Sequence, residues 1–166
     1  MTFGRQDLER AYRAHGPVVL RRARQIMGNE AEAREVLQEV FTSLLERPEQ
    51  FDGRAAASTF LYAMTTNLCL NKLRNSRTRA RLVAEHVEPG IGRVAPGDAE
   101  ARAILRQLLV QLPFEEARVA VFYYQDGMTR PEIAEILGCS LRTVGTLLER
   151  LAAHVREPSS TAESNR

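Results

Sequence analysis

The stretch from Phe60 to Arg81 begins as an apolar helix and ends as a cationic one. Its apolar residues recur at roughly helical spacing, which predicts one long helix with a buried face. The second half carries five cations and no acid: Lys72, Arg74, Arg77, Arg79 and Arg81. The helix dipole favours basic residues at a C-terminus, but that effect explains one or two of them. The run therefore favours a polyphosphate backbone as its partner, rather than a solvated helix end.

Apolar residues at three- and four-residue spacing predict further helices on both sides of this stretch. We expect them at 6–27, 30–45, 98–112, 113–125, 130–137 and 140–155. Pro17 should kink or split the first helix, and Ser58 or Thr59 should cap the helix of 60–81. Between 84 and 98 the periodicity lapses and two Pro-Gly pairs occur, which predicts a linker. The fold class is therefore all-α, with two small helical domains joined by a flexible linker.

The second domain carries the clearest local signals. Thr129 and Glu132 form a capping-box pattern, and Gly138 ends the short helix that they begin. Ser140 then caps a further helix, so the pair is typical of a helix-turn-helix (winged-helix-like) DNA-binding domain. In that motif the second helix enters the major groove and reads base edges. The alternative is an ordinary helical hairpin that binds no DNA.

Composition excludes several classes of protein. The chain has 166 residues, of which 44% are hydrophobic and 27% charged, as in soluble globular proteins. The net charge is only +2, but acids gather in 29–52 and bases in 72–81, which suggests two different partner surfaces. Cys69 and Cys139 lie far apart in apolar patterns, and no signal peptide or membrane span is evident, so we expect a cytoplasmic protein. No nucleophile–base pair, metal-ligand spacing or phosphate loop is present, so we expect no enzyme, cofactor or metal.

Three segments resemble bacterial sigma factors of the sigma-70 family. The segment 29–47 is similar to the helix that binds core RNA polymerase, and 59–79 is similar to the promoter-melting and minus-ten helix. The segment 111–151 resembles the domain that binds the minus-thirty-five element. The matching residues are Gln38, Glu39, Phe41, Leu61, Asn67, Arg74, Leu112-Pro113, Gly127, Glu132-Ile133-Ala134, Leu137-Gly138 and Thr143-Val144. The resemblance covers about residues 8–155, without a separate third domain, and is strongest to the extracytoplasmic-function group.

The resemblance implies three binding surfaces. Contacts to core polymerase would come from Glu35, Gln38, Glu39 and Phe41. Contacts to the minus-ten region would come from Phe60, Asn67, Asn71, Lys72, Arg74 and Arg77, with the loop 51–58 holding a flipped base. Contacts to the minus-thirty-five element would come from Arg130, Ser140, Arg142, Thr143, Thr146 and Arg150. The implied domains are sigma region 2 at 1–83, the linker at 84–98, sigma region 4 at 99–156 and a disordered tail at 157–166.

Some positions depart from the family pattern. Phe60 stands where Trp is usual and Asn71 where Asp is usual, while Gly145 and Glu149 make the recognition helix less basic. We therefore expect weak phosphate anchoring at the minus-thirty-five element. Three alternatives stay open: a helix-turn-helix regulator that does not bind polymerase, an interaction module whose DNA surfaces have decayed, and, least favoured, an enzyme. The resemblance also implies an anti-sigma factor as a candidate partner.

Overall fold

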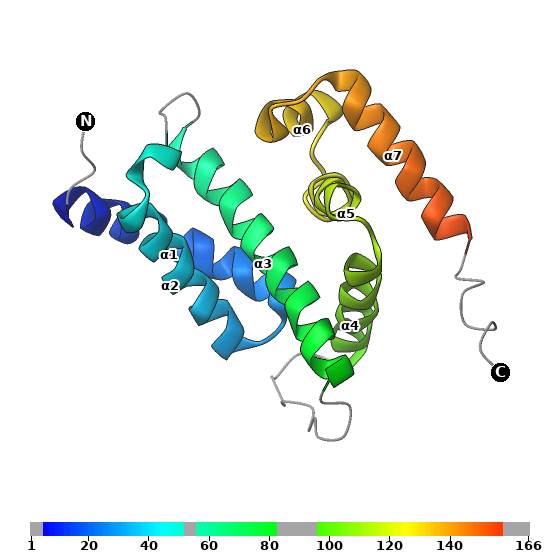
Figure 1. Cartoon of the computed structure of the whole chain (residues 1–166), viewed down its shortest axis with the longest axis horizontal. Helices are drawn as coiled ribbons and strands as arrows, with labels where there is room; N and C mark the ends of the chain where they lie inside the picture. Colours follow the sequence, from blue (N-terminus) through cyan, green and yellow to red (C-terminus); the bar gives the residue numbers. More distant parts are fainter. Residues whose placement is uncertain (1–4, 52–55, 83–95, 158–166) are drawn as a thin grey trace. The chain divides into compact units, whose positions relative to one another are not determined.

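The computed structural model describes residues 5–51, 56–82 and 96–157, with side chains for 5–51, 56–76 and 100–157. The chain divides into two compact units, Met1–Val110 and Gln111–Arg166. All regular structure in the described ranges is helical, which confirms the predicted all-α class (Figure 1). No helix in these ranges is long and apolar enough to cross a membrane.

The first unit begins with two long helices joined by a tight turn. Helix α1 spans Arg5–Met27 and α2 spans Glu30–Glu46. Gly28 takes a φ of 67°, the left-handed conformation that favours glycine at a helix end. Asn29 then caps α2 by accepting a hydrogen bond from the Glu32 amide at 3.2 Å. The expected end of the first helix at Met27 is confirmed.

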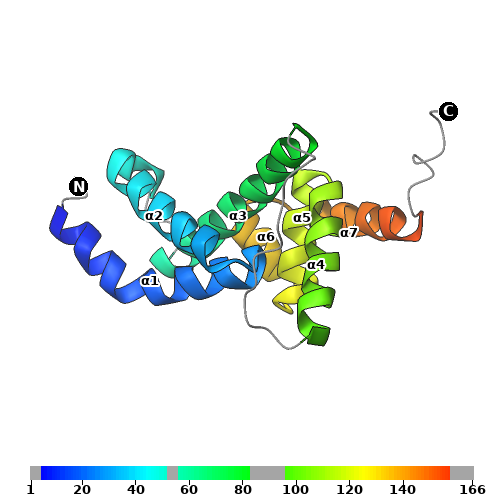
Figure 2. The same ribbon diagram turned by 90° about the horizontal axis from the view of Figure 1, so that it is seen from below.

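Helix α1 is not split at Pro17; of the two outcomes that we expected, a kink or a split, the structure confirms the kink (Figure 2). The helix is continuous from Arg5 to Met27 with Pro17 inside it, and Figure 2 shows it changing direction along its length. Proline removes one helical hydrogen bond and leaves the carbonyl four residues earlier without a donor. That residue is Arg13, which is exposed, as is Pro17 itself. Water can therefore satisfy the carbonyl, and the helix bends instead of ending.

The core of the first unit lies where α1, α2 and α3 (Ala57–Leu82) pack against one another (Figures 1 and 2). The predicted faces supply most of it: Val19, Ala23, Ile26, Met27, Ala33, Val36, Leu37, Val40, Phe41, Leu44, Leu61, Cys69 and Leu70 are buried. Helix α3 starts at Ala57, one or two residues before the expected caps Ser58 and Thr59, so both lie inside the helix. A short 3-10 turn, Pro48–Gln50, follows α2 as the predicted stop at Pro48 requires.

A buried cation, absent from our expectations, also joins α1 to α3. Arg22 is 2% exposed, and its guanidinium donates to the Thr66 hydroxyl at 3.2 Å. The guanidinium carbon also lies 4.2 Å from the centre of the Tyr62 ring, in cation–π geometry. Nearby, burial raises the pKa of the Cys69 thiol to about 12, which keeps it protonated. Arginine's long stem lets it fill core volume while its head finds polar partners.

Between residues 111 and 157, the described part of the second unit, four helical segments follow one another. Helix α5 spans Phe114–Ala120 and runs into a π-helical turn, Val121–Gln125. Helices α6 (Arg130–Leu137) and α7 (Leu141–Arg156) follow, with Gly138 in the left-handed conformation between them. The capping box of Thr129 and Glu132 and the Ser140 cap are both present, as predicted. The buried residues Val119, Val121, Phe122, Ile133, Val144, Leu147, Leu148 and Leu151 form the core.

The helix-turn-helix is therefore confirmed, but the winged-helix-like description is not. A wing is a β-hairpin, and the described part of this unit holds no strand. Helix α4 spans Pro96–Gln111, so the last residues assigned to the linker, 96–98, are helical. The rest of the expected linker and nearly all of the expected tail lie outside the described residues. Residues 52–55 of the expected base-holding loop lie outside them too.

Candidate functional site

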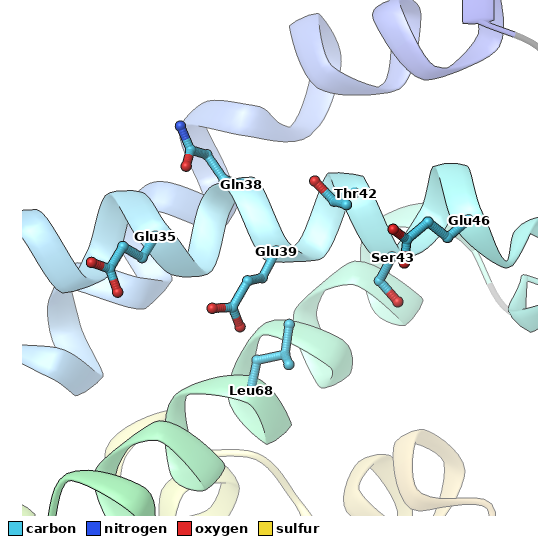
Figure 3. Close-up of a pocket in the computed structure, with 7 residues that line it drawn as sticks. All are labelled: Glu35, Gln38, Glu39, Thr42, Ser43, Glu46 and Leu68. Carbon is cyan, nitrogen blue, oxygen red and sulfur yellow. The ribbon is translucent and has the colours of Figure 1, made fainter.

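An open groove of about 460 Å³ runs along α2 in the first unit (Figure 3). Six of its residues come from α2 and one from α3: Glu35, Gln38, Glu39, Thr42, Ser43, Glu46 and Leu68. Three carboxylates around one apolar side chain make this surface acidic with an apolar patch. The first turn of α2 carries two further acids, Glu30 and Glu32. Such a groove is complementary to a cationic partner surface.

Lys72 of α3 brings a positive charge to this groove. Its Nζ lies 2.7 Å from Oε1 of Glu39 and 3.1 Å from Oε2 of Glu35. The hydrogen bond to Glu39, followed by that to Glu35, raises the pKa of Lys72. Figure 3 shows the two carboxylates on the same side of α2, with Leu68 across from Glu39. The predicted basic run is thus not wholly unneutralised: Lys72 is paired with acids from another helix.

The four residues expected to bind polymerase differ in their exposure to solvent. Glu35, Gln38 and Glu39 line the groove and are exposed. Phe41 is 5% exposed and packs edge-to-face on Tyr12, with ring centroids 4.9 Å apart. Its side chain belongs to the core between α1 and α2. A direct contact between Phe41 and polymerase stays a prediction, and the burial of Phe41 argues against it.

The residues expected at the minus-ten region all lie on α3. Asn71 is exposed, while Asn67 and Arg74 are half-buried. The side-chain oxygen of Asn67 is buried without a hydrogen-bond partner, which is uncommon for a polar atom. The side chain of Arg77 lies outside the description. Asn67, Asn71, Lys72 and Arg74 thus lie on one helix, from near its middle toward its C-terminal end.

Two aromatic rings flank the loop that was expected to hold a base. Phe51 and Phe60 pack with ring centroids 5.4 Å apart and planes tilted by 56°. Phe60 was expected in the site, but Phe51 was only the first residue of the expected loop. Its partner could not be inferred from spacing, because no helical or strand period relates positions 51 and 60. Aromatic faces are suited to stacking on an unpaired base.

The recognition residues of the second unit are all exposed. Arg130 lies at the start of α6, and the others lie at the cap or on the outer face of α7: Ser140, Arg142, Thr143, Thr146 and Arg150. Their opposite face is buried against α5 and α6 through Val144, Leu147 and Leu148. The amphipathic pattern of α7 therefore places every predicted minus-thirty-five residue on the solvent side.

The hydroxyls of this face are already hydrogen-bonded within the helix. Ser140 Oγ accepts from the Thr143 amide at 3.1 Å and lies 2.8 Å from Thr143 Oγ1. Thr146 donates its only hydroxyl proton to the carbonyl of Arg142 at 3.1 Å. Two of the three hydroxyl protons are thus used, and the arginines are the main remaining donors.

Sequence reasoning missed four residues of the groove: Thr42, Ser43, Glu46 and Leu68. The first three follow Gln38 and Glu39 at helical spacing along the exposed face of α2, so the periodicity could have indicated them. Leu68 was assigned to the buried face of α3, but it is half-buried and lines the groove. No local signal separates these two roles for a leucine.

Two family models match the chain, and between them they span both units. Residues 11–79 match sigma-70 region 2, and residues 102–155 match sigma-70 region 4. The first range contains the groove and the described part of α3's basic end, and the second contains the helix-turn-helix. The region 4 match begins within α4, although α4 lies almost wholly in the first compact unit.

Curated relatives are similar over most of their length. The chain is 30% identical over 138 residues to the ECF RNA polymerase sigma factor SigW of Bacillus subtilis, covering 75% of this chain and 74% of SigW. It is 26% identical over 151 residues to the ECF RNA polymerase sigma factor SigM of Mycobacterium tuberculosis, covering 91% and 76%.

Two solved structures share the fold. One is of CnrH in complex with the cytosolic domain of CnrY, with a TM-score of 0.53, 21% identity, and coverage of 92% of this chain and 87% of that one. The other is of the sigma factor RpoE in complex with the anti-sigma factor NepR from Bartonella quintana, with a TM-score of 0.51, 15% identity, and coverage of 91% and 95%. With the ordered family models and the likeness to SigW, the conclusion is plain: the chain belongs to the extracytoplasmic-function group of the sigma-70 family.

Proposed function

We propose that this chain is a sigma factor that binds core RNA polymerase and directs promoter-specific, DNA-templated transcription initiation. The observation that carries the proposal is the acidic groove on α2, in the same unit as the basic end of α3. A helix-turn-helix regulator that acts without polymerase has no need for a second, acidic surface. Family membership supports the same conclusion, because both matched models are parts of sigma factors.

The groove is the proposed docking surface for core polymerase. Glu35, Gln38 and Glu39 would meet a cationic face of the enzyme, and Leu68 would supply an apolar contact at the centre. Charged groups that match across an interface speed association and set orientation more than they add affinity. Phe41 would act from inside, by holding α2 against α1 through Tyr12.

The part of α3 from Asn67 onward, with Phe60 near the start of the helix, is the proposed minus-ten surface. Asn67 and Asn71 offer amides to base edges, and Arg74 and Arg77 offer charge to phosphates. Phe60, with Phe51 beside it, would stack on a base that has left the duplex. Unstacking costs a few kcal/mol per step, which backbone contacts and capture of the base would offset.

The outer face of α7 is the proposed minus-thirty-five surface, where Arg142 and Arg150 supply the charge. We also place the protein in the cytoplasm, in a role without covalent chemistry. Because both similar solved structures are complexes with a partner, and the partner of RpoE is an anti-sigma factor, we propose that an anti-sigma factor regulates this chain too.

Reconstituted transcription tests the proposal. Purified core polymerase with this chain should start transcripts at defined sites on genomic fragments that core alone ignores. Sequencing the transcript starts would identify the promoter elements. Failure to bind core, together with no specific initiation from any fragment, would refute the proposal. DNA binding without core binding would favour the plain helix-turn-helix regulator.

A charge reversal in the groove tests the docking surface. Glu46→Lys should weaken core binding about tenfold, because it places a cation where a cationic partner is expected. Glu49→Lys is the matched control, since Glu49 is exposed nearby but does not line the groove. Equal effects of the two changes would mean that net charge, not the groove, determines core affinity.

A further inference from the structure

Lys72 stands between the two proposed surfaces of the first unit. It belongs by sequence to the basic end of α3, yet its ammonium group contacts two carboxylates of the groove on α2. The Lys72 side chain is 23% exposed, whereas those of Glu35 and Glu39 are 62% and 47% exposed. The lysine is therefore partly enclosed, and its carboxylate partners remain open to a binding partner. The two carboxylates are accessible to polymerase, whereas the lysine belongs to the basic run that we expect to meet DNA.

Phosphate and carboxylate compete for the same ammonium group. A lysine that already pairs with two carboxylates contributes less to attracting a DNA backbone, because its charge is compensated locally. A cationic partner seated in the groove would pair with the same carboxylates and weaken their hold on the lysine. The two binding events would then favour each other through one side chain.

We propose that Lys72 couples the polymerase-binding groove to the minus-ten surface: Glu35 and Glu39 hold it back from DNA in the free chain, and occupation of the groove releases it. This coupling rests on the proposed function. By thermodynamic reciprocity, promoter DNA must strengthen core binding by the same factor by which core strengthens DNA binding. Lys72 thus couples the two surfaces and contacts DNA only when the groove is occupied.

The coupling can be measured on the free full-length chain, without polymerase. The double variant Glu35→Gln/Glu39→Gln keeps the side-chain shapes and removes the charges that hold Lys72. It should bind a single-stranded minus-ten oligonucleotide roughly three- to tenfold tighter than the native chain at about 50 mM salt. The plot of log affinity against log salt should steepen by about 0.7, as for one additional phosphate contact on a single strand.

Two comparisons separate release of Lys72 from a general loss of negative charge. Glu49→Gln/Glu100→Gln removes two exposed carboxylates outside the groove and should give a much smaller gain. Adding Lys72→Met to the groove double variant should abolish the gain, and this change should cost less DNA affinity in the native chain than in the groove double variant. Adding Lys72→Arg to the double variant instead should keep most of the gain in DNA affinity. Circular dichroism and thermal unfolding verify that each variant is folded.

Three outcomes would overturn the coupling. The first is a gain that persists without Lys72, and the second is a loss from Lys72→Met that is as large in the native chain as in the groove variant. The third is no gain, or no detectable binding, by the groove variant at low salt. Core binding is assayed separately: its absence refutes the proposed function, whereas normal core binding with no Lys72-dependent gain refutes the coupling alone.

Discussion

The polar contacts of the first unit, which holds the groove, and those of the helix-turn-helix join residues at very different separations along the chain. In the first unit, Lys72 contacts Glu35 across 37 residues and Arg22 contacts Thr66 across 44. In the second unit, Thr129 bonds to Glu132 and Ser140 pairs with Thr143, three residues away in each case. The contacts of the first unit thus join separate helices, whereas those of the helix-turn-helix stabilise the start of α6 and of α7. The second unit also has one contact between helices, from His154 Nδ1 of α7 to Glu116 Oε2 of α5 at 2.7 Å. The first unit should therefore be sensitive to the loss of one central polar residue, and the second to changes in its caps.

The largest effect is expected from Arg22→Ala. The change removes a buried stem, a guanidinium–hydroxyl hydrogen bond and a cation–π contact, and it leaves a cavity between α1 and α3. We expect the free energy of unfolding to fall by about 2–4 kcal/mol, as for other large-to-small changes in a core. Urea unfolding followed by circular dichroism measures it.

Two neighbouring variants sharpen this prediction. Arg21→Ala changes an exposed arginine beside it and should alter stability by no more than about 0.5 kcal/mol. Arg22→Met keeps much of the stem volume and should lose less than Arg22→Ala. If Arg22→Ala were as mild as Arg21→Ala, the long-range contact would not be important to the first unit.

The next effect is expected from Thr129→Ala. This variant loses the side-chain cap of α6 and the hydroxyl that bonds to Glu132. The helix should lose about 1 kcal/mol. Amide hydrogen exchange should report faster opening in α6, with unchanged rates in α1 and α2. Glu132→Gln is the milder comparison, because glutamine can still accept a bond from the Thr129 amide. Faster exchange in the first unit would contradict the local character of these contacts.

The same difference explains which features could be predicted from sequence. The caps at Asn29, Thr129 and Ser140 depend on residues three positions apart, so their patterns are visible in the chain. The helix-turn-helix and most of the buried faces follow from such local spacing. Arg22 could not be predicted to be buried, because its partners lie 40 or more residues later and arginine usually stays exposed.

The candidate site shows the same limit. The resemblance assigned Glu35, Gln38 and Glu39 to polymerase and Lys72 to DNA. The pairing of these charges depends on how α2 packs against α3, which no local pattern specifies. Pro17 shows a related limit. The sequence left open whether this proline would kink or split α1, because the outcome depends on whether solvent reaches the freed carbonyl.

A smaller effect, of opposite sign, is expected from Gly145→Ala. A Cβ at this position of α7 would meet no atom within 4 Å, and the residue has no positive φ. Alanine should therefore stabilise the helix by about 0.8–1 kcal/mol. Gly138→Ala is the matched control, because Gly138 has a φ of 63° and an alanine there is strained. Thermal unfolding should move up for the first variant and down for the second. If the midpoint of thermal unfolding fell for both variants, contacts between α7 and other elements would outweigh the helix propensity of residue 145.

The smallest effect is expected from an ion-pair cluster at the turn between α1 and α2, whose members lie four to six residues apart in the chain. Glu30 accepts from Arg24, six residues earlier, at 2.6 and 2.7 Å, and from Arg34, four residues later, at 3.0 Å. The hydrogen bond from Arg24, helped by Arg34, lowers the pKa of Glu30 to about 2. Because its folded pKa lies below the unfolded value near 4.5, the ionised carboxylate stabilises the folded chain above pH 4.5.

This contribution should disappear as the pH falls from about 4.5 to about 2, where Glu30 takes up a proton in the folded state. Since other carboxylates titrate in the same range, the quantity to measure is the stability difference between the native chain and Glu30→Gln. Urea unfolding at neutral pH and at several acidic values should show a small difference that shrinks with acidity. The cluster is exposed and screened by salt, so the difference should also be smaller at high ionic strength. A pH-independent difference would mean that Glu30 stabilises the turn through packing or helix propensity and not through its charge.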